Sequence, residues 1–307
     1  MTYLSIVIPV YNEAENLREL TRRLMTAAAG LEKAYEIIFV DDGSSDASWE
    51  ILEELHHQHQ GLIRLVGLNR NYGQHMAIMA GFERVRGQVV ATLDADLQNP
   101  PEEIPRLVRK IEEGYDVVAG WRENRRDSFL RRWPSLLVNQ AASRIVGLTQ
   151  HDYGCMLRVY TRPIVDQINQ CGESSTFIPA LANTFARRAA EIKVAHEDRQ
   201  GGRSKYNLLK LVKLNFDLMT GYSLLPLHVV NLLGIFIALL GLAFGLFLFI
   251  RRLVVGPEVE GVFTLFAILF VFIGLQILVT GLLGEYVGRI FREVRRRPRY
   301  FIRRVRE

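Results

Sequence analysis

Two carboxylates and an amide follow an apolar, β-prone run in the first third of the chain. Residues 89–93 predict a buried strand, and Asp94, Asp96 and Gln98 follow it at alternate positions. Side chains two residues apart lie on the same side of an extended backbone, so both carboxylates can face one ligand. Carboxylate and amide oxygens are preferred ligands of hard cations such as Mg²⁺ or Mn²⁺, which keep positions for substrate phosphate. The pattern predicts a divalent-metal site; the alternative is an acidic loop that caps a helix starting near Pro101.

A second acidic strand end favours the site over the helix cap. Residues 35–40 predict a strand, and the sequence Asp41-Asp42-Gly43-Ser44 follows it directly. In open α/β sheets, ligands bind beyond the carboxyl ends of the strands. Two acidic strand ends therefore indicate one substrate site.

Strand-like and helix-like segments alternate along the first 120 residues. Such alternation is typical of an α/β fold with a mostly parallel, Rossmann-like sheet. Asn12 can cap the first helix, and Ser45 or Asp46 can cap the second. Neither a G-x-G-x-x-G nor a P-loop pattern follows a strand, which argues against dehydrogenases and P-loop NTPases. The expected strands are 4–9, 35–40, 62–68, 89–93 and 116–119, and the expected helices are 13–30, 47–59, 76–85 and 101–113, with a polar loop over 69–75.

The composition indicates a cellular compartment and a class of partner. The two cysteines, Cys155 and Cys171, form no disulfide or zinc pattern and are expected to be reduced cytosolic thiols. No signal peptide is expected at the N-terminus. The net charge is +5, with arginines gathered near apolar blocks and at the C-terminus. This favours anionic lipid headgroups over nucleic acid as a partner, because no nucleic-acid-binding motif occurs.

Two uncharged runs predict a transmembrane hairpin over 223–288, with helices at about 229–250 and 261–284. Each run of about 20 residues can cross a hydrocarbon core of about 30 Å. The tail 289–307 is arginine-rich, so the positive-inside rule places both it and residues 1–222 in the cytoplasm. Segments 125–148 and 205–222 mix apolar and basic residues and predict interfacial amphipathic helices. For the first of these, an ordinary surface helix is the alternative.

Several motifs carry a resemblance to the family 2 glycosyltransferases: VIPVYNE at 7–13, VDDGS at 40–44 and LDADLQ at 93–98, together with two C-terminal membrane helices. Within that family the chain resembles the polyprenyl-phosphate glycosyltransferases. The resemblance extends to the branch that transfers 4-deoxy-4-formamido-L-arabinose. Its motifs are NRNYGQH at 69–75, DADLQNPPEEIP at 94–105, DYGCMLR at 152–158, STFIP at 175–179, GLLGEY at 281–286 and RPRYF at 297–301.

The resemblance implies a GT-A fold, a UDP-sugar donor, Mg²⁺ or Mn²⁺ as cofactor, and undecaprenyl phosphate as acceptor. It places the enzyme in the inner membrane of a Gram-negative bacterium, as a homo-oligomer that is tetrameric in related enzymes. Transfer would invert the anomeric centre in one displacement. The product would serve lipid A modification with aminoarabinose, which gives resistance to polymyxin-type peptides.

The resemblance also implies roles for single residues. The expected UDP-sugar site consists of Pro9, Tyr11, Glu13, Asp42, Arg70, Gly73, His75, Asp94 and Ala95. Asp94, Asp96 and Gln98 are the expected metal ligands, and Asp96 and Asp152 the expected catalytic residues. Candidates for holding the acceptor phosphate are Arg122, Arg131, Arg132 and Lys205, since basic groups bind phosphate; attraction to the membrane surface is their alternative role. Glu13 can instead stabilise a helix dipole, and His75 can be a loop histidine bonded to backbone.

Two other functions remain open at this point. The first is transfer of glucose or mannose to a polyprenyl phosphate by the same family. The second is a membrane-anchored protein that binds a nucleotide sugar without turnover. Donor competition distinguishes the first, and the metal constellation argues against the second.

Overall fold

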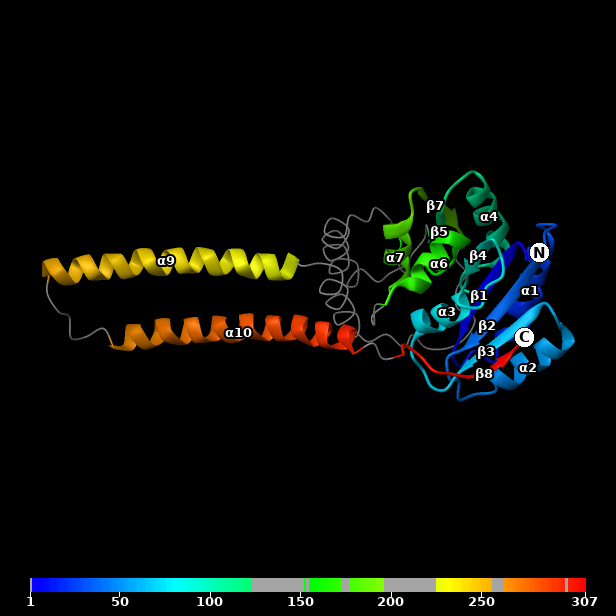
Figure 1. Cartoon of the computed structure of the whole chain (residues 1–307), viewed down its shortest axis with the longest axis horizontal. Coiled ribbons are helices and arrows are strands. Elements are labelled where there is room, and N and C mark those ends of the chain that lie inside the picture. The colour runs from blue at the N-terminus through cyan, green and yellow to red at the C-terminus, as the bar shows by residue number, and fades with distance from the viewer. Residues whose placement is uncertain are drawn as a thin grey trace. The chain divides into compact units, whose positions relative to one another are not determined.

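The computed structural model describes residues 2–122, 152, 155–172, 177–195, 225–255, 262–295 and 298–307. In these residues one sheet has the strand order β7-β5-β6-β4-β1-β2-β3-β8 (Figure 1). Its strands are β1 (Leu4–Val10), β2 (Tyr35–Asp41), β3 (Ile63–Leu68), β4 (Val89–Thr92), β5 (Val117–Arg122), β6 (Arg158–Thr161), β7 (Ala189–Val194) and β8 (Ile302–Arg306).

The sheet is mostly parallel, as the alternation of segments predicts. β1 pairs in parallel with β2 and β4, β2 with β3, and β5 with β7. β6 runs antiparallel between β4 and β5, and β8 runs antiparallel to β3 at the edge. The chain proceeds from β1 outward to β3 and then returns to place β4 on the other side of β1. This reversal makes the β1/β4 junction a topological switch point, where open α/β sheets bind ligands.

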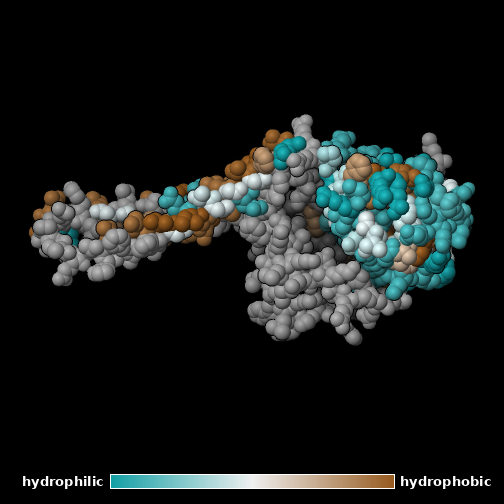
Figure 2. Space-filling view, turned by 90° about the horizontal axis from the view of Figure 1, so that it is seen from below, coloured by the Kyte–Doolittle hydropathy of each residue, from teal (hydrophilic) through white to brown (hydrophobic). Residues whose placement is uncertain are grey.

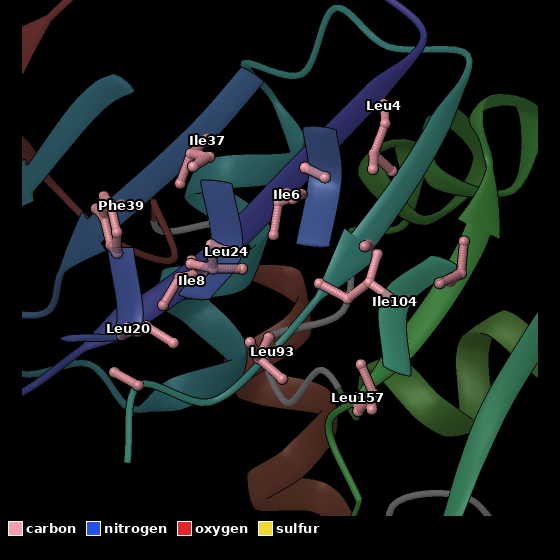
Figure 3. Packing of buried hydrophobic residues seen from close by; sticks show 14 of the residues in the cluster. Leu4, Ile6, Ile8, Leu20, Leu24, Ile37, Phe39, Leu93, Ile104 and Leu157 are labelled. Carbon is pink, nitrogen blue, oxygen red and sulfur yellow. The ribbon is translucent and has the colours of Figure 1, made fainter. Parts of the chain in front are cut away.

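Helices cover both faces of the sheet because the strands are apolar on both sides. On one face, Ile6 and Ile8 of β1 and Phe39 of β2 pack with Leu20 and Leu24 (Figure 3). The helices of this layer, which contact one another, are α1 (Leu17–Ala29), α2 (Ser48–Gln58) and α4 (Ile104–Glu112), with the short 3-10 helix η1 (Pro101–Glu103) before α4. The opposite face is covered by α3 (Gln74–Phe82), which contacts α6 (Arg162–Gln170); α6 in turn contacts α7 (Ile178–Phe185).

The first helix starts later than the sequence predicts. It begins at Leu17 with Asn16 at the N-cap, and Asn12 does not cap it. Asn12 instead has a left-handed backbone, with φ of 54°, and its side-chain oxygen accepts a hydrogen bond from the Ser45 N–H. The prediction for Asn12 is therefore wrong, because a contact to a distant loop replaces the local cap.

Helices α9 (Leu225–Val255) and α10 (Val262–Val294) belong to a second compact unit. Within α9, Val230–Phe247 has a mean hydropathy of 2.4 and is long and apolar enough to cross a membrane, while α10 contains a shorter apolar stretch, Phe272–Gly288. Many large apolar side chains of both helices are exposed (Figure 2). The expected amphipathic helices, 125–148 and 205–222, lie outside the described residues.

The end of the basic tail forms a strand that the sequence analysis did not predict. β8 pairs with β3, and residues 297–307 belong to the same compact unit as the sheet. Charged side chains on an edge strand discourage its pairing with other molecules.

Candidate active site

Four loops meet at the carboxyl edge of the sheet. We call them loop 1 (11–16), loop 2 (42–47), loop 3 (69–73) and loop 4 (93–100), after β1, β2, β3 and β4 respectively. Val10 pairs with Asp41 and Asp41 with Gly67, so the first three strands end at the same level. The parallel arrangement thus brings together most of the polar residues that the sequence predicts for the donor site.

Backbone-to-side-chain hydrogen bonds fix loop 1 against loop 2. The Asn12 N–H donates to Ser44 Oγ over 3.0 Å, and the Ser45 N–H donates to Asn12 Oδ1 over 2.8 Å. The Glu13 N–H donates to Ser48 Oγ at 3.0 Å. Left-handed conformations of non-glycine residues are strained and cluster at functional sites. These hydrogen bonds hold Asn12 in its left-handed conformation.

The residues in and beside loop 1 differ in exposure and polarity. Pro9 is half-buried within β1, and the Tyr11 side chain is 40% exposed. Glu13 lies before α1, and its carboxylate accepts a hydrogen bond of 2.7 Å from Asn16 Nδ2. An exposed aromatic ring beside a carboxylate is suited to a base and a ribose, because the ring offers a flat apolar face and the carboxylate accepts hydroxyl hydrogen bonds.

Asp42 joins loop 2 to loop 3. One carboxylate oxygen accepts a hydrogen bond from the Tyr72 N–H at 2.7 Å and the other from the Gly73 N–H at 2.8 Å. The residue is buried, and burial raises the pKa of the carboxyl from 3.8 to about 6, although both hydrogen bonds act in the opposite direction. Each carboxylate oxygen has a second lone pair, so Asp42 retains capacity to accept from a ligand.

Gly43 allows loop 3 to pack directly against loop 2. Its φ is +71°, and a Cβ at this position would lie 2.5 Å from the carbonyl carbon of Arg70. Arg70 itself is exposed, and its guanidinium lies 4.8 Å from the centroid of the Tyr72 ring. Gly73 also has a positive φ, of +95°, at the start of α3. The close backbone approach requires glycine at position 43, whereas at position 73 the requirement comes from the positive φ alone.

Loop 4 presents two carboxylates on one side of a strained turn. Asp94 and Asp96 are half-buried, whereas Leu93, Ala95 and Leu97 between and beside them are buried. Leu97 has a φ of 61°, a strained value for a buried, branched side chain. Alternate side chains of loop 4, those of Asp94, Asp96 and Gln98, are therefore partly exposed while their neighbours are buried.

The contacts of loop 4 suit a metal that is shared with a substrate. Gln74 Nε2 donates to Asp94 Oδ1, and the Gln98 N–H donates to Asp96 Oδ1 at 3.2 Å. In the described residues, no three His, Cys, Asp or Glu side chains are arranged so that they could hold a metal ion by themselves. Two carboxylates and one amide are hard oxygen ligands, which fit Mg²⁺ or Mn²⁺ completed by a diphosphate. Asp94, Asp96 and Gln98 therefore have the right chemistry for such an ion.

His75 lies in the first turn of α3, so it is not a loop residue. Its ring meets Phe177 edge-on, with centroids 5.1 Å apart. Burial, with a smaller effect from Arg158, lowers the pKa of His75 to about 4, so the ring is neutral at pH 7. Its Nδ1 atom is enclosed and makes no hydrogen bond within the described part of the chain.

Asp152 precedes β6 in a segment that is fixed to the end of β4. The residue is buried, and its main-chain carbonyl accepts a hydrogen bond of 3.2 Å from Arg158 Nη2. Arg158 is fully buried and also donates from Nε to the Cys155 carbonyl at 3.0 Å. Thr92 Oγ1, at the end of β4, donates to the Met156 carbonyl at 2.7 Å. Arg158 is not among the site residues predicted from the sequence, although it is a charged residue inside the DYGCMLR motif.

Three of the four residues predicted to hold the acceptor phosphate lie outside the described residues. Arg122 is the last residue of β5, where its backbone pairs with Val194 of β7. Arg131, Arg132 and Lys205 lie outside the described residues. The assignment of these four residues to a lipid phosphate remains a prediction.

Comparison with known proteins gives concordant results. A family model described as "Glycosyl transferase family 2" matches residues 5–169. A relative from Klebsiella pneumoniae (strain 342), called undecaprenyl-phosphate 4-deoxy-4-formamido-L-arabinose transferase, is 56% identical over 304 residues, which cover 98% of this chain and 93% of the relative. A relative of the same name from Edwardsiella ictaluri (strain 93-146) is 53% identical over 305 residues, covering 99% and 94%.

A solved structure shares the fold. Glucosyl-3-phosphoglycerate synthase from Mycobacterium tuberculosis, in complex with Mn²⁺, uridine diphosphate and phosphoglyceric acid, has a TM-score of 0.52 and 17% sequence identity. The match covers 71% of this chain and 76% of that one. The likeness confirms the α/β fold with a GT-A-like, mostly parallel sheet.

Proposed function

The chain belongs to glycosyl transferase family 2, and from that premise we propose that it transfers 4-deoxy-4-formamido-L-arabinose from UDP to undecaprenyl phosphate. It is a glycosyltransferase. The observation that carries the choice of substrates is the near full-length identity, 53–56%, to relatives named for that reaction.

Loops 1 to 3 would bind the nucleoside. In this proposal the exposed Tyr11 ring packs on uracil, and Glu13 and Asp42 accept hydrogen bonds from ribose hydroxyls or the uracil N–H. Pro9 borders this pocket. The exposed Arg70 offers a guanidinium to the diphosphate, to which its planar fork is matched. Gly73, His75 and Ala95 would line the sugar and diphosphate side.

Asp94, Asp96 and Gln98 would hold Mg²⁺ or Mn²⁺. When bound, the ion offsets the charge that develops on the departing UDP. The protein's contribution is to keep both carboxylates on one side of loop 4 and to hold Asp94 through Gln74.

The acceptor needs positioning more than activation. A phosphate monoester already carries between one and two negative charges near neutral pH, so its oxygen is a competent nucleophile. In the proposed step that oxygen forms a bond to the anomeric carbon from the side opposite UDP. The bond from that carbon to the UDP oxygen breaks, its electron pair leaves with UDP, and the configuration inverts. Asp152 would act as base or as a partner to a sugar hydroxyl, and Arg122, Arg131, Arg132 and Lys205 would hold the lipid phosphate.

The proposed setting is the bacterial inner membrane. α9 has a stretch that is able to span a bilayer, and we propose that α10 spans it as well, as a hairpin with the catalytic domain and the C-terminus in the cytosol. We propose a homo-oligomer, tetrameric as in related enzymes. The lipid-linked sugar would serve aminoarabinose modification of lipid A and so polymyxin resistance.

The test is a transfer assay with the purified full-length enzyme. Undecaprenyl phosphate is incubated with UDP-4-deoxy-4-formamido-L-arabinose, with UDP-glucose as competitor, in the presence and absence of Mn²⁺. We expect a metal-dependent glycolipid from the arabinose donor alone. Product from UDP-glucose instead would overturn the donor assignment and leave the reaction type intact. UDP binding without product from any donor would overturn the enzymatic proposal.

A further inference from the structure

The C-terminal strand β8 is fixed to the sheet at both of its ends. The Asn69 N–H of loop 3 donates to the Phe301 carbonyl over 3.1 Å. At the opposite end of β8, the Glu307 carboxylate forms ion pairs with Arg64, Arg84 and Arg86. Contacts at both ends fix the position of the residues between them, including Arg304.

Arg304 lies flat against the domain. Its guanidinium is 3.5 Å from the centroid of the Trp49 ring, on α2. A Cβ at Gly67 of β3 would lie 2.7 Å from Arg304 Cγ and 3.0 Å from the Trp49 ring, so glycine is what leaves room for the arginine. Arginine stacks on aromatic faces and keeps its charge when partly buried. The side chain is therefore oriented before any ligand binds.

The guanidinium of Arg304 reaches the end of β2. Arg304 Nη2 lies 4.0 Å from Asp41 Oδ2, on a carboxylate that is almost fully buried. Asp41 Oδ1 accepts a hydrogen bond of 3.1 Å from the Ser44 N–H in loop 2. Ser44 Oγ in turn accepts from the Asn12 N–H of loop 1. A continuous series of polar contacts thus runs from β8 through loop 2 to loop 1.

We propose that Arg304 is a positioning residue for the nucleotide site, acting through Asp41 to hold loops 1 and 2 in their binding conformation. The inference rests on the proposed function, because those loops are the proposed nucleoside pocket. It adds that the pocket is completed by a residue that follows α10 in the chain. An uncompensated buried Asp41 would otherwise relax, and the Ser44–Asn12 contact would relax with it.

The chain offers a matched control on the same strand. Arg306 also pairs with a carboxylate of the domain, Glu53 on α2, at 2.9 Å. Among the described residues, no hydrogen bond or ion pair joins Glu53 to loop 1 or loop 2. Arg304→Ala and Arg306→Ala each remove one arginine and one ion pair from β8, so they separate an effect on the pocket from an effect on strand docking.

The first measurement is binding of UDP with Mn²⁺ to full-length variants, without acceptor. We expect Arg304→Ala to raise the Kd for UDP about 5-fold, as coupled contacts of this kind do. Arg306→Ala should change it less than about 2-fold, as is usual for exposed pairs. Arg304→Lys should recover part of the loss, since it restores the charge beside Asp41 without the stacked fork. In turnover, the KM for the donor should rise while kcat and the KM for undecaprenyl phosphate stay near wild type.

A double-mutant cycle tests whether Arg304 acts through Asp41. In an Asp41→Asn background, Arg304→Ala should have little further effect on UDP affinity. Equal UDP affinity of wild type and Arg304→Ala, or equal losses in Arg304→Ala and Arg306→Ala, would overturn the inference. Failure of the wild-type protein to bind UDP would instead overturn the proposed function, so the two failures are distinguishable.

Discussion

The buried carboxylate of Asp42 makes a quantitative prediction about pH. Its pKa is raised by burial from 3.8 to about 6, in spite of two backbone hydrogen bonds. At 1.36 kcal/mol for each pKa unit the shift corresponds to about 3 kcal/mol, which solvent screening at the loop surface reduces to about 2 kcal/mol. Ionisation of Asp42 in the folded protein thus lowers the free energy of unfolding.

The sign follows from the direction of the shift. Because the pKa is higher in the folded state, the stabilising contribution of Asp42 is fully present below pH 3.8 and is lost as the pH rises through about 6. The side chain of Asp42→Asn does not titrate. The free energy of unfolding of this variant, relative to that of wild type, should therefore rise by about 2 kcal/mol between pH 3.8 and about pH 6. Its amide nitrogen faces one backbone N–H, at a cost of about 1–3 kcal/mol. At pH 7 the two effects nearly cancel, leaving stability within about 1 kcal/mol of wild type.

The assay is unfolding of the full-length protein in detergent between pH 4 and pH 8, combined with UDP binding at pH 7. UDP affinity should fall in Asp42→Asn because the Gly73 N–H loses its acceptor. Asp46 is the matched control: burial raises the pKa of this carboxyl, but hydrogen bonds from Ser48 and Ala14 outweigh it and lower the pKa. Because Asp46 titrates below pH 4, Asp46→Asn should lose stability relative to wild type by an amount that stays constant between pH 4 and pH 8. A stability difference between wild type and Asp42→Asn that is the same at pH 4 and pH 7 would refute the reasoning.

Three further predictions concern glycines and a histidine. Gly43→Ala and Gly61→Ala both replace glycines of positive φ, but a Cβ meets loop 3 only in the first, and nothing within 4 Å in the second. Gly43→Ala should therefore lose stability by about 1–3 kcal/mol more than Gly61→Ala and bind UDP more weakly; equal melting temperatures would contradict this. The pKa of His75 is lowered by burial to about 4 from 6.5, so its stabilising contribution is present above pH 6.5 and lost as the pH falls toward 4; His75→Gln should remove that dependence from melting curves. In Gly81→Ala the new Cβ would lie 2.4 Å from Val7 Cγ1, which should cost about 1–3 kcal/mol and be partly reversed by adding Val7→Ala; no effect of either change on denaturant unfolding would exclude the packing argument.

The parallel half of the sheet could be predicted because each of its strands is an apolar run. β1 to β4 appear within a few residues of their expected bounds, and the polar residues after them mark the site. Local pattern is sufficient here, since burial on both faces demands continuous apolar strands. The glycosyltransferase family followed from the same motifs and is confirmed by comparison.

Features that depend on distant contacts could not be predicted. Asn12 has the residue type of a helix cap, and only its contact with Ser45 shows why it adopts a left-handed conformation. β8 is a short, charged segment with two apolar residues, Ile302 and Val305, and its arginines suggested a solvated tail. Its strand conformation comes from pairing with β3 and from the arginine cluster around Glu307. No periodicity in the sequence carries that information.

The most direct test of the account is the effect of Mn²⁺ on UDP affinity in the full-length enzyme and in Asp96→Asn. The diphosphate is expected to lie beside the carboxylates of loop 4, so Mn²⁺ should tighten UDP binding at least about 10-fold in the wild type. Asp96→Asn should lose most of that enhancement while binding UDP without metal as the wild type does. Equal enhancement by Mn²⁺ in both proteins would contradict the assignment of loop 4 as the metal-diphosphate site.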